Sequence, residues 1–103
     1  MEKNDMVIFI AFYTPDQYKL LLKYADDRKK LDDKWEDWFI NFSNAKNVLQ
    51  NDFIVEGFHI DVQKMQDYFK SRKLKNNGKN RAAYTSVEGT NAYKRKLSNL
   101  PED

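Results

Sequence analysis

The sequence contains no cysteine, a single histidine, and few residues that interrupt regular structure: two prolines and three glycines in 103 residues. Without cysteine the chain has no disulfide, no thiolate metal site and no cysteine nucleophile. His59 alone cannot form a multi-histidine metal site, and no serine lies in a recognisable nucleophile motif. The glycines, at positions 57, 78 and 89, do not form a phosphate-binding loop. We therefore expect no cofactor, no metal and no catalytic residues.

Long hydrophobic runs are also missing. The longest uncharged apolar run, Met6 to Tyr13, is too short to span a bilayer, and neither a basic n-region nor a cleavage site accompanies it. These features favour a soluble, cytoplasmic protein. Hydrophobic residues make up 41% of the chain and aromatic residues 15%, which is enough for one core. We expect a single globular domain over residues 1–88 and a flexible basic tail over residues 89–103.

The apolar run predicts a strand from Met6 to Tyr13, buried on both faces and central to the core. Helix-start signals follow it directly. Thr14 is a candidate N-cap, Pro15 suits the first helical position, and Gln17 completes a capping box. The pattern predicts a helix that runs to about Asp27.

A second helix, with the strongest periodicity in the chain, is expected to begin near Asp32 or Asp33 and to end near Gln50. Its acidic first turn is typical of a helix start, so a metal or catalytic role is not needed to explain it. The apolar positions recur at steps of three and four residues and predict a buried stripe: Leu31, Trp35, Trp38, Phe42, Ala45 and Leu49.

A second strand is predicted from Phe53 to Ile60, and Asp61 then caps a helix that ends near Arg72. A turn at Asn77-Gly78 precedes a short helix from Lys79 to about Val87. The expected fold is α/β (α+β): a small two-stranded sheet packed by three to four helices in the order β-α-α-β-α-(α). Both strand directions remain open. A second copy of the chain is one way to complete so small a sheet.

Three local motifs resemble those of a small family of prokaryotic single-domain proteins. They are Tyr13-Thr14-Pro15, the Trp35-Glu36-Asp37-Trp38 segment, and an Asn-Gly-x-x-Arg-Ala-x-Tyr segment over residues 77–84. The resemblance covers roughly residues 6–85. It implies a shared fold, and it implies no particular chemistry.

Charge is unevenly distributed along the chain. Residues 1–63 contain eight Lys/Arg and twelve Asp/Glu, whereas residues 64–103 contain ten and four. Clustered cations with a nearby aromatic ring can contact phosphates and stack on a base. We therefore predict a non-enzymatic binding module that contacts nucleic acid or an acidic protein. The candidate binding residues are Lys70, Arg72, Lys73, Lys75, Lys79, Arg81 and Tyr84.

Other interpretations of the same residues remain open. The cations can simply be solvated and offset the dipole of the preceding helix, and Arg81 can pair with an aspartate inside the fold. The chain can instead be a small interaction or inhibitory module, of an accessory or phage type, that uses exposed aromatics. If the chain dimerises, some of Trp38, Phe39 and Phe58 can lie at the interface. An enzyme would require Arg81, His59 and the acids of the second helix to converge.

Overall fold

The computed structural model describes residues 6–99, so the two ends of the predicted domain and tail, 1–5 and 100–103, lie outside the described residues. Its elements confirm the predicted α+β order. They are β1 (Val7–Phe12), α1 (Pro15–Tyr24), the 3-10 helix η1 (Arg28–Lys30), α2 (Trp35–Leu49), β2 (Ile54–His59), α3 (Val62–Ser71) and α4 (Gly78–Ser98). No helix among residues 6–99 has the length and apolarity needed to cross a membrane.

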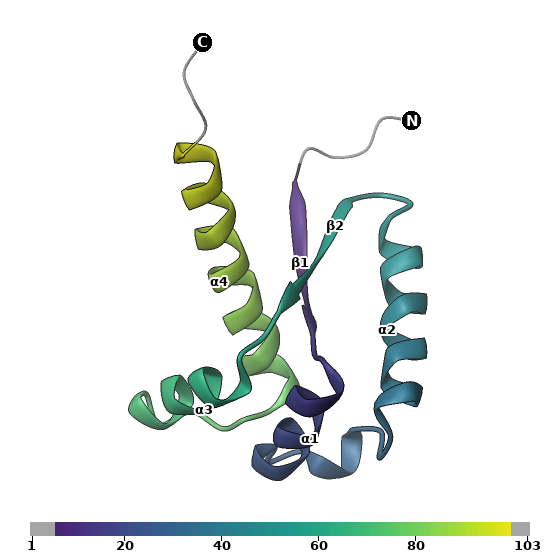
Figure 1. Cartoon of the computed structure of the whole chain (residues 1–103), viewed down its shortest axis with the longest axis vertical. Helices are drawn as coiled ribbons and strands as arrows, with labels where there is room; N and C mark the ends of the chain where they lie inside the picture. The colour runs from purple at the N-terminus through teal and green to yellow at the C-terminus, as the bar shows by residue number, and fades with distance from the viewer. Residues whose placement is uncertain (1–5, 100–103) are drawn as a thin grey trace.

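The two strands pair in parallel, with Val7 opposite Ile54 and Phe12 opposite His59. A parallel pair needs a crossover connection rather than a tight turn. Here α1 lies beyond the carboxyl end of β1, and α2 carries the chain back to the end at which β1 begins (Figure 1). The direction left open by the sequence is therefore parallel.

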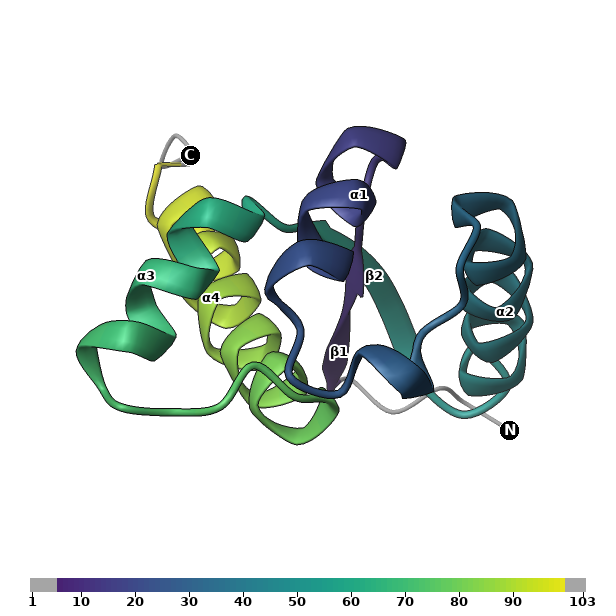
Figure 2. The ribbon, with the colours of Figure 1, turned by 90° about the horizontal axis from the view of Figure 1, so that it is seen from below.

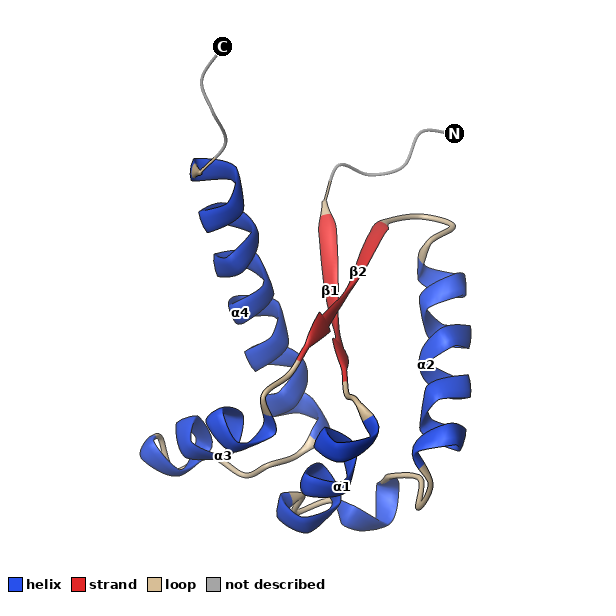
Figure 3. Cartoon of the chain, in the orientation of Figure 1, coloured by secondary structure: helices blue, strands red, loops and turns tan. Residues whose placement is uncertain are grey.

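Helices cover both faces of this narrow sheet. α4 lies on one face and α2 on the other, while α1 and α3 lie beyond the carboxyl ends of the strands (Figures 1 and 2). Because neighbouring side chains of a strand point to opposite faces, Phe9 meets Tyr93 of α4 and Phe12 meets Phe42 of α2, with ring centroids 6.2 and 5.3 Å apart. Figure 3 shows how little of the molecule is strand.

The buried core lies beyond the strands rather than around β1. The prediction that β1 is buried on both faces is wrong, since all six of its residues are half-buried. A sheet of two strands is too narrow for its helices to enclose β1. The core is instead built where α1, α3 and the first half of α4 meet, from Tyr13, Tyr18, Leu21, Ile60, Val62, Met65, Phe69 and Tyr84.

Helix α2 departs from prediction in its start and in its burial. It begins at Trp35, and the residue at its N-cap, Lys34, makes no side-chain cap. The carboxylates expected to cap it are engaged elsewhere: the Asp32 side chain accepts a hydrogen bond from the Asn41 side chain, and Asp33 pairs with Arg28. None of the residues of α2 is fully buried, and Ala45 of the predicted stripe is exposed.

The predicted capping box at α1 forms only in part. Thr14 accepts a hydrogen bond from the Gln17 amide, as expected for an N-cap. The Gln17 side chain does not reach back, however. Its oxygen accepts the Val62 amide at 2.7 Å, at the first position of α3. Gln17 thus ties the starts of two helices together, which a local sequence motif cannot reveal.

Helix α4 is a single helix to Ser98, so the predicted helix end near Val87 is wrong, and residues 89–98 of the predicted tail are helical. The sequence suggested an end there because the helical pattern stops beyond Glu88-Gly89. In the structure Gly89 is buried in mid-helix, and a Cβ added there would lie 2.5 Å from Cγ of Phe9. The glycine therefore allows α4 to approach β1 closely.

Replacement of Gly89 by alanine tests this close contact. An exposed helical Gly→Ala change stabilises by about 1 kcal/mol, but overpacking a tight contact costs about 1–3 kcal/mol. We expect Gly89→Ala to lower the free energy of unfolding, measured by urea denaturation. The control is Ser86→Ala on the exposed side of α4, which we expect to have little effect. Stabilisation by Gly89→Ala would mean that α4 does not pack on β1 as described.

Candidate functional site

The structure divides the predicted binding residues into two groups. Lys70, Arg72, Lys73, Lys75 and Lys79 are exposed, whereas Arg81 and Tyr84 are buried, with 7% and 6% of their surface accessible. The exposed five come from the end of α3, the connecting loop and the first turn of α4. The two buried residues belong to the interior that supports this surface.

Arg81 is bound by an aspartate, as one interpretation of the sequence allowed. Its two terminal nitrogens each donate to one carboxylate oxygen of Asp27, at 2.8 Å. One of them also donates to the main-chain and side-chain oxygens of Asn76, at 3.1 and 2.9 Å. Such a two-pronged contact is the strongest geometry available to arginine. It leaves this guanidinium with its charge compensated inside the fold.

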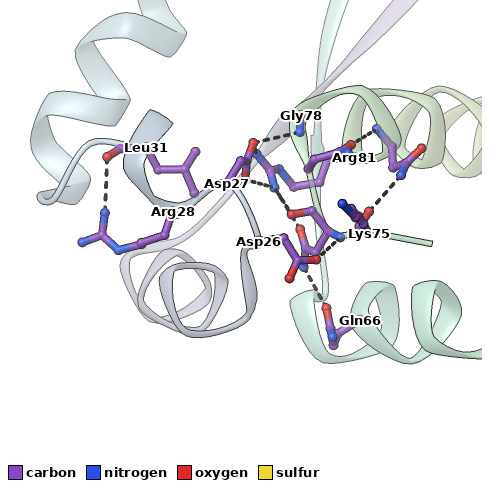
Figure 4. A network of polar contacts seen from close by, with 11 residues as sticks. Asp26, Asp27, Arg28, Leu31, Gln66, Lys75, Gly78 and Arg81 are labelled. Atoms are coloured by element: carbon purple, nitrogen blue, oxygen red, sulfur yellow. Dashed lines mark hydrogen bonds and ion pairs between the residues drawn. The ribbon is translucent and has the colours of Figure 1, made fainter. Parts of the chain in front are cut away.

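The same aspartates hold the loop before α4. The Asp26 side chain accepts the Asn76 amide at 2.7 Å, and the Asp26 amide donates to the Asn76 carbonyl oxygen at 2.9 Å. Asp27 also accepts the Gly78 amide at 3.0 Å, and the Asn76 side chain donates to Gln66 of α3. We call Asp26, Asp27, Asn76 and Arg81 the clamp (Figure 4).

Sequence reasoning missed most of the clamp. No local pattern gave a role to Asp26, Asp27 or Asn76. Asn76 is 1% exposed, a degree of burial that is unusual for asparagine. Contacts that span some fifty residues leave no local pattern, so only the isolated arginine among lysines pointed to this network.

Electrostatics in the clamp favour the charged carboxylate. The hydrogen bonds from Arg81 hold the pKa of Asp27 below its usual value, more strongly than partial burial raises it. Close by, burial raises the pKa of Tyr13 to about 12, although the Arg81 charge opposes that shift. Asp27 is thus ionised, and Tyr13 protonated, at neutral pH.

Tyr84 packs in the interior instead of offering a face to a base. Its ring centroid lies 5.1 Å from that of Tyr68 and 6.0 Å from that of Phe69. The Arg72 guanidinium in turn lies 4.1 Å from the centroid of the Tyr68 ring, in a cation–π contact. Arg72 is therefore held at the surface by an aromatic side chain of α3.

Helix α3 ends in a well-defined turn that displays the cations. The Leu74 amide donates to the Phe69 carbonyl and the Lys73 amide to the Lys70 carbonyl, which together form a Schellman motif. Lys73 occupies its left-handed position, with φ of 57°. Because this backbone conformation suits glycine best, it disfavours a lysine at this position.

The surface around α3 and α4 carries a large excess of positive charge. Residues 62–99 contain ten Lys/Arg and two Asp/Glu. Within the described part of the chain the two ion pairs are Arg28–Asp33 and Arg81–Asp27. The other nine cations of this segment are exposed, and no ion pair within residues 6–99 neutralises them.

A second candidate surface lies between α2 and β2. An open groove of about 460 Å³ is lined there by Phe12, Phe39 and Phe42, with His59 at β2. The exposed side chains of α2 include Phe39, Ile40 and Val48, of which 39%, 57% and 67% of the surface is accessible. Of these, Phe39 lines the groove, whereas Val48 lies on the opposite side of the helix. Exposed aromatic side chains that line a groove suit a protein partner. Of the aromatics named from the sequence, Trp38 and Phe58 are half-buried.

The residues of the enzyme hypothesis do not converge. His59 lines the groove beside α2, whereas Arg81 lines a separate cavity together with Tyr13 and Leu21. Within residues 6–99, His, Asp and Glu side chains do not gather into a group of three or more that could hold a metal ion.

Comparison with known proteins gives no match: no protein-family model, no curated protein and no solved structure is similar to this chain. The resemblance of the three local motifs to a prokaryotic family is thus not supported by a family model, and function has to be argued from the surfaces themselves.

The clamp predicts a specific loss of stability in acid. Folding lowers the pKa of Asp27. The stability that its ionised carboxylate contributes is therefore fully present above the unfolded pKa of about 3.9, and it is lost as the pH falls through the pKa of the folded state. Asp27→Asn should cost about 3 kcal/mol at pH 7, since it leaves a buried arginine without its counter-charge. The variant should also lose less stability than the natural protein between pH 5 and pH 2.

Asp33→Asn is the matched control, because Asp33 is 86% exposed in its pair with Arg28. Exposed pairs contribute little, so this variant should unfold almost as the natural protein does. Urea denaturation over a pH series measures both. Equal effects of the two substitutions would contradict a structural role for the clamp.

Proposed function

We propose that the protein is a non-enzymatic module that binds nucleic acid through the exposed cations Lys70, Arg72, Lys73, Lys75 and Lys79. The observation that carries the proposal is the unneutralised positive charge of residues 62–99, where nine exposed cations outnumber two acids and none of the nine has an ion pair within residues 6–99. Binding of phosphates by such a surface is driven by the release of counterions.

Dipole effects do not account for all of these cations. A lysine near the end of α3, such as Lys70, is favoured by the negative end of the helix. Lys79 lies in the first turn of α4, where the helix dipole disfavours a positive charge. A positive charge at this position, where it does not help folding, supports a role in binding.

The clamp gives Arg81 a different role from the one expected from sequence. It holds the loop between α3 and α4 through Asn76 and Asp27, so the cations of this loop are arranged before a partner arrives. Such preorganisation reduces the entropy lost on binding. In this proposal Arg81 and Tyr84 support the surface, and the five exposed residues make the contacts.

Salt dependence of binding tests the proposal. If about four cations contact phosphates, the logarithm of the association constant should fall against the logarithm of salt concentration with a slope of about −3.6 on duplex DNA. Fluorescence anisotropy with labelled duplex and single-stranded DNA measures this slope. Alanine at Lys70, Lys73, Lys75 and Lys79 together should abolish binding and leave the circular dichroism spectrum unchanged.

The control replaces four exposed lysines elsewhere, Lys19, Lys23, Lys29 and Lys30, so that the net charge changes equally. This variant should retain most of the affinity. Equal losses in both variants would show that binding depends on net charge alone, and absence of binding by the natural protein at low salt would refute the proposal. An acidic protein would then remain as the candidate partner of this surface.

The groove between α2 and β2 supports a second candidate, an interaction or inhibitory module that binds a protein through Phe12, Phe39 and Phe42. Its supporting observation is the open groove beside α2, whose aromatic lining no other segment of residues 6–99 covers fully. A complex held together by apolar contacts resists high salt, so the same salt series separates the two candidates.

A further inference from the structure

Strand β1 has an outer edge that the described part of the chain leaves unpaired. The Ile60 amide donates to the Phe12 carbonyl, so Phe12 points its main-chain groups toward β2. Because these groups alternate in direction along a strand, those of Val7, Phe9 and Ala11 point away from β2. The Tyr13 carbonyl, with the same parity, indeed faces outward and accepts the Trp35 side chain at 2.7 Å.

This edge lacks the features that protect exposed strands. Its sequence from Val7 to Phe12 has no charge, no proline and no glycine. The other edge of the sheet belongs to β2, which contains Glu56 and Gly57. Charges and glycines discourage pairing with a further strand, whereas a bare apolar edge invites it. The edge of β1 is therefore better suited than the edge of β2 to pair with a further strand.

Room for another strand exists beside β1. A cavity of about 280 Å³ runs along Phe9, Ile10 and Ala11. Both helical layers line it, α4 through Ala82 and Thr85 and the α2 layer through Trp38. The cavity thus borders three consecutive residues of β1 and lies between α4 and α2. This is the position that a third strand would take in a wider sheet.

We propose that a second copy of the chain fills this position, with the two β1 strands antiparallel and Phe9 opposite its symmetry mate. The main-chain groups of Val7, Phe9 and Ala11 point outward. A two-fold axis at Phe9 places Val7 opposite Ala11 of the partner subunit and Phe9 opposite its own mate, so each outward residue faces another outward residue. Three such pairs exchange about six hydrogen bonds. The result is a four-stranded sheet in the order β2-β1-β1-β2.

The chemistry of the edge favours an identical partner. A two-fold interface brings like side chains together, which a charged strand would resist by repulsion, and β1 has no charge. Next to the edge, α4 presents the small side chain of Ala82, which is exposed. The compensated charge of Arg81 at the same cavity adds no net repulsion. The dimer does not depend on the nucleic-acid proposal.

Sedimentation equilibrium at tens of micromolar tests the dimer, and the natural protein should have the mass of two chains. Ala11→Pro removes an outward amide that makes no hydrogen bond within residues 6–99, so the variant should fold but be monomeric. His59→Pro changes the outer edge of β2 and should remain dimeric. A monomeric natural protein, or a folded Ala11→Pro variant that still dimerises, would overturn the proposal.

Cross-linking tests the register without relying on proline. The chain has no cysteine, so Val7→Cys and Ala11→Cys can be introduced alone or together. The register places residue 7 opposite residue 11 of the partner, with Cα atoms about 5.5 Å apart, within disulfide reach. Like positions lie about 13 Å apart along the strand. The double variant should form disulfide dimers; equal cross-linking by either single variant, or none by the double variant, would overturn the register.

Discussion

The ion pair between Arg81 and Asp27 is the contact on which the rest of the structure depends. It joins the turn after α1 to the first turn of α4, and through Asn76 it also fixes the loop that leaves α3. Two segments more than fifty residues apart in the sequence thus meet at one guanidinium. With its first turn held there, α4 can run along β1 to Ser98, and the loop between α3 and α4 keeps its cations at the surface.

The narrow sheet accounts for most of the exposed chemistry. Two parallel strands cannot cover a whole helix face, so the aromatic stripe of α2 is half-buried and β1 keeps an unpaired edge. Burial is concentrated instead beyond the strands, where α1 and α3 pack together. The protein thus has a firm core at one end and three open surfaces: the cationic loop, the groove of α2 and the edge of β1.

Local signals predicted the elements well, and distant contacts explain the failures. The run around Phe9 predicted β1, and Asp61 caps α3 as expected. The helix was predicted to end near Val87, before Gly89, because the contact that explains this glycine, the approach of Phe9, lies eighty residues away in the sequence. The five exposed cations were identifiable from composition. The burial of Arg81 and Tyr84 was not, because it depends on Asp27 and on α3 packing.

A double-mutant cycle between Asp27 and Arg81 tests the central claim most directly. The free energy of unfolding is measured at pH 7 for the natural protein, Asp27→Asn, Arg81→Gln and the double variant. If this buried pair stabilises the fold, replacing the second partner after the first should cost little further free energy of unfolding. The coupling energy should then be about 2–4 kcal/mol. A coupling below about 0.5 kcal/mol, typical of an exposed pair, would contradict the account.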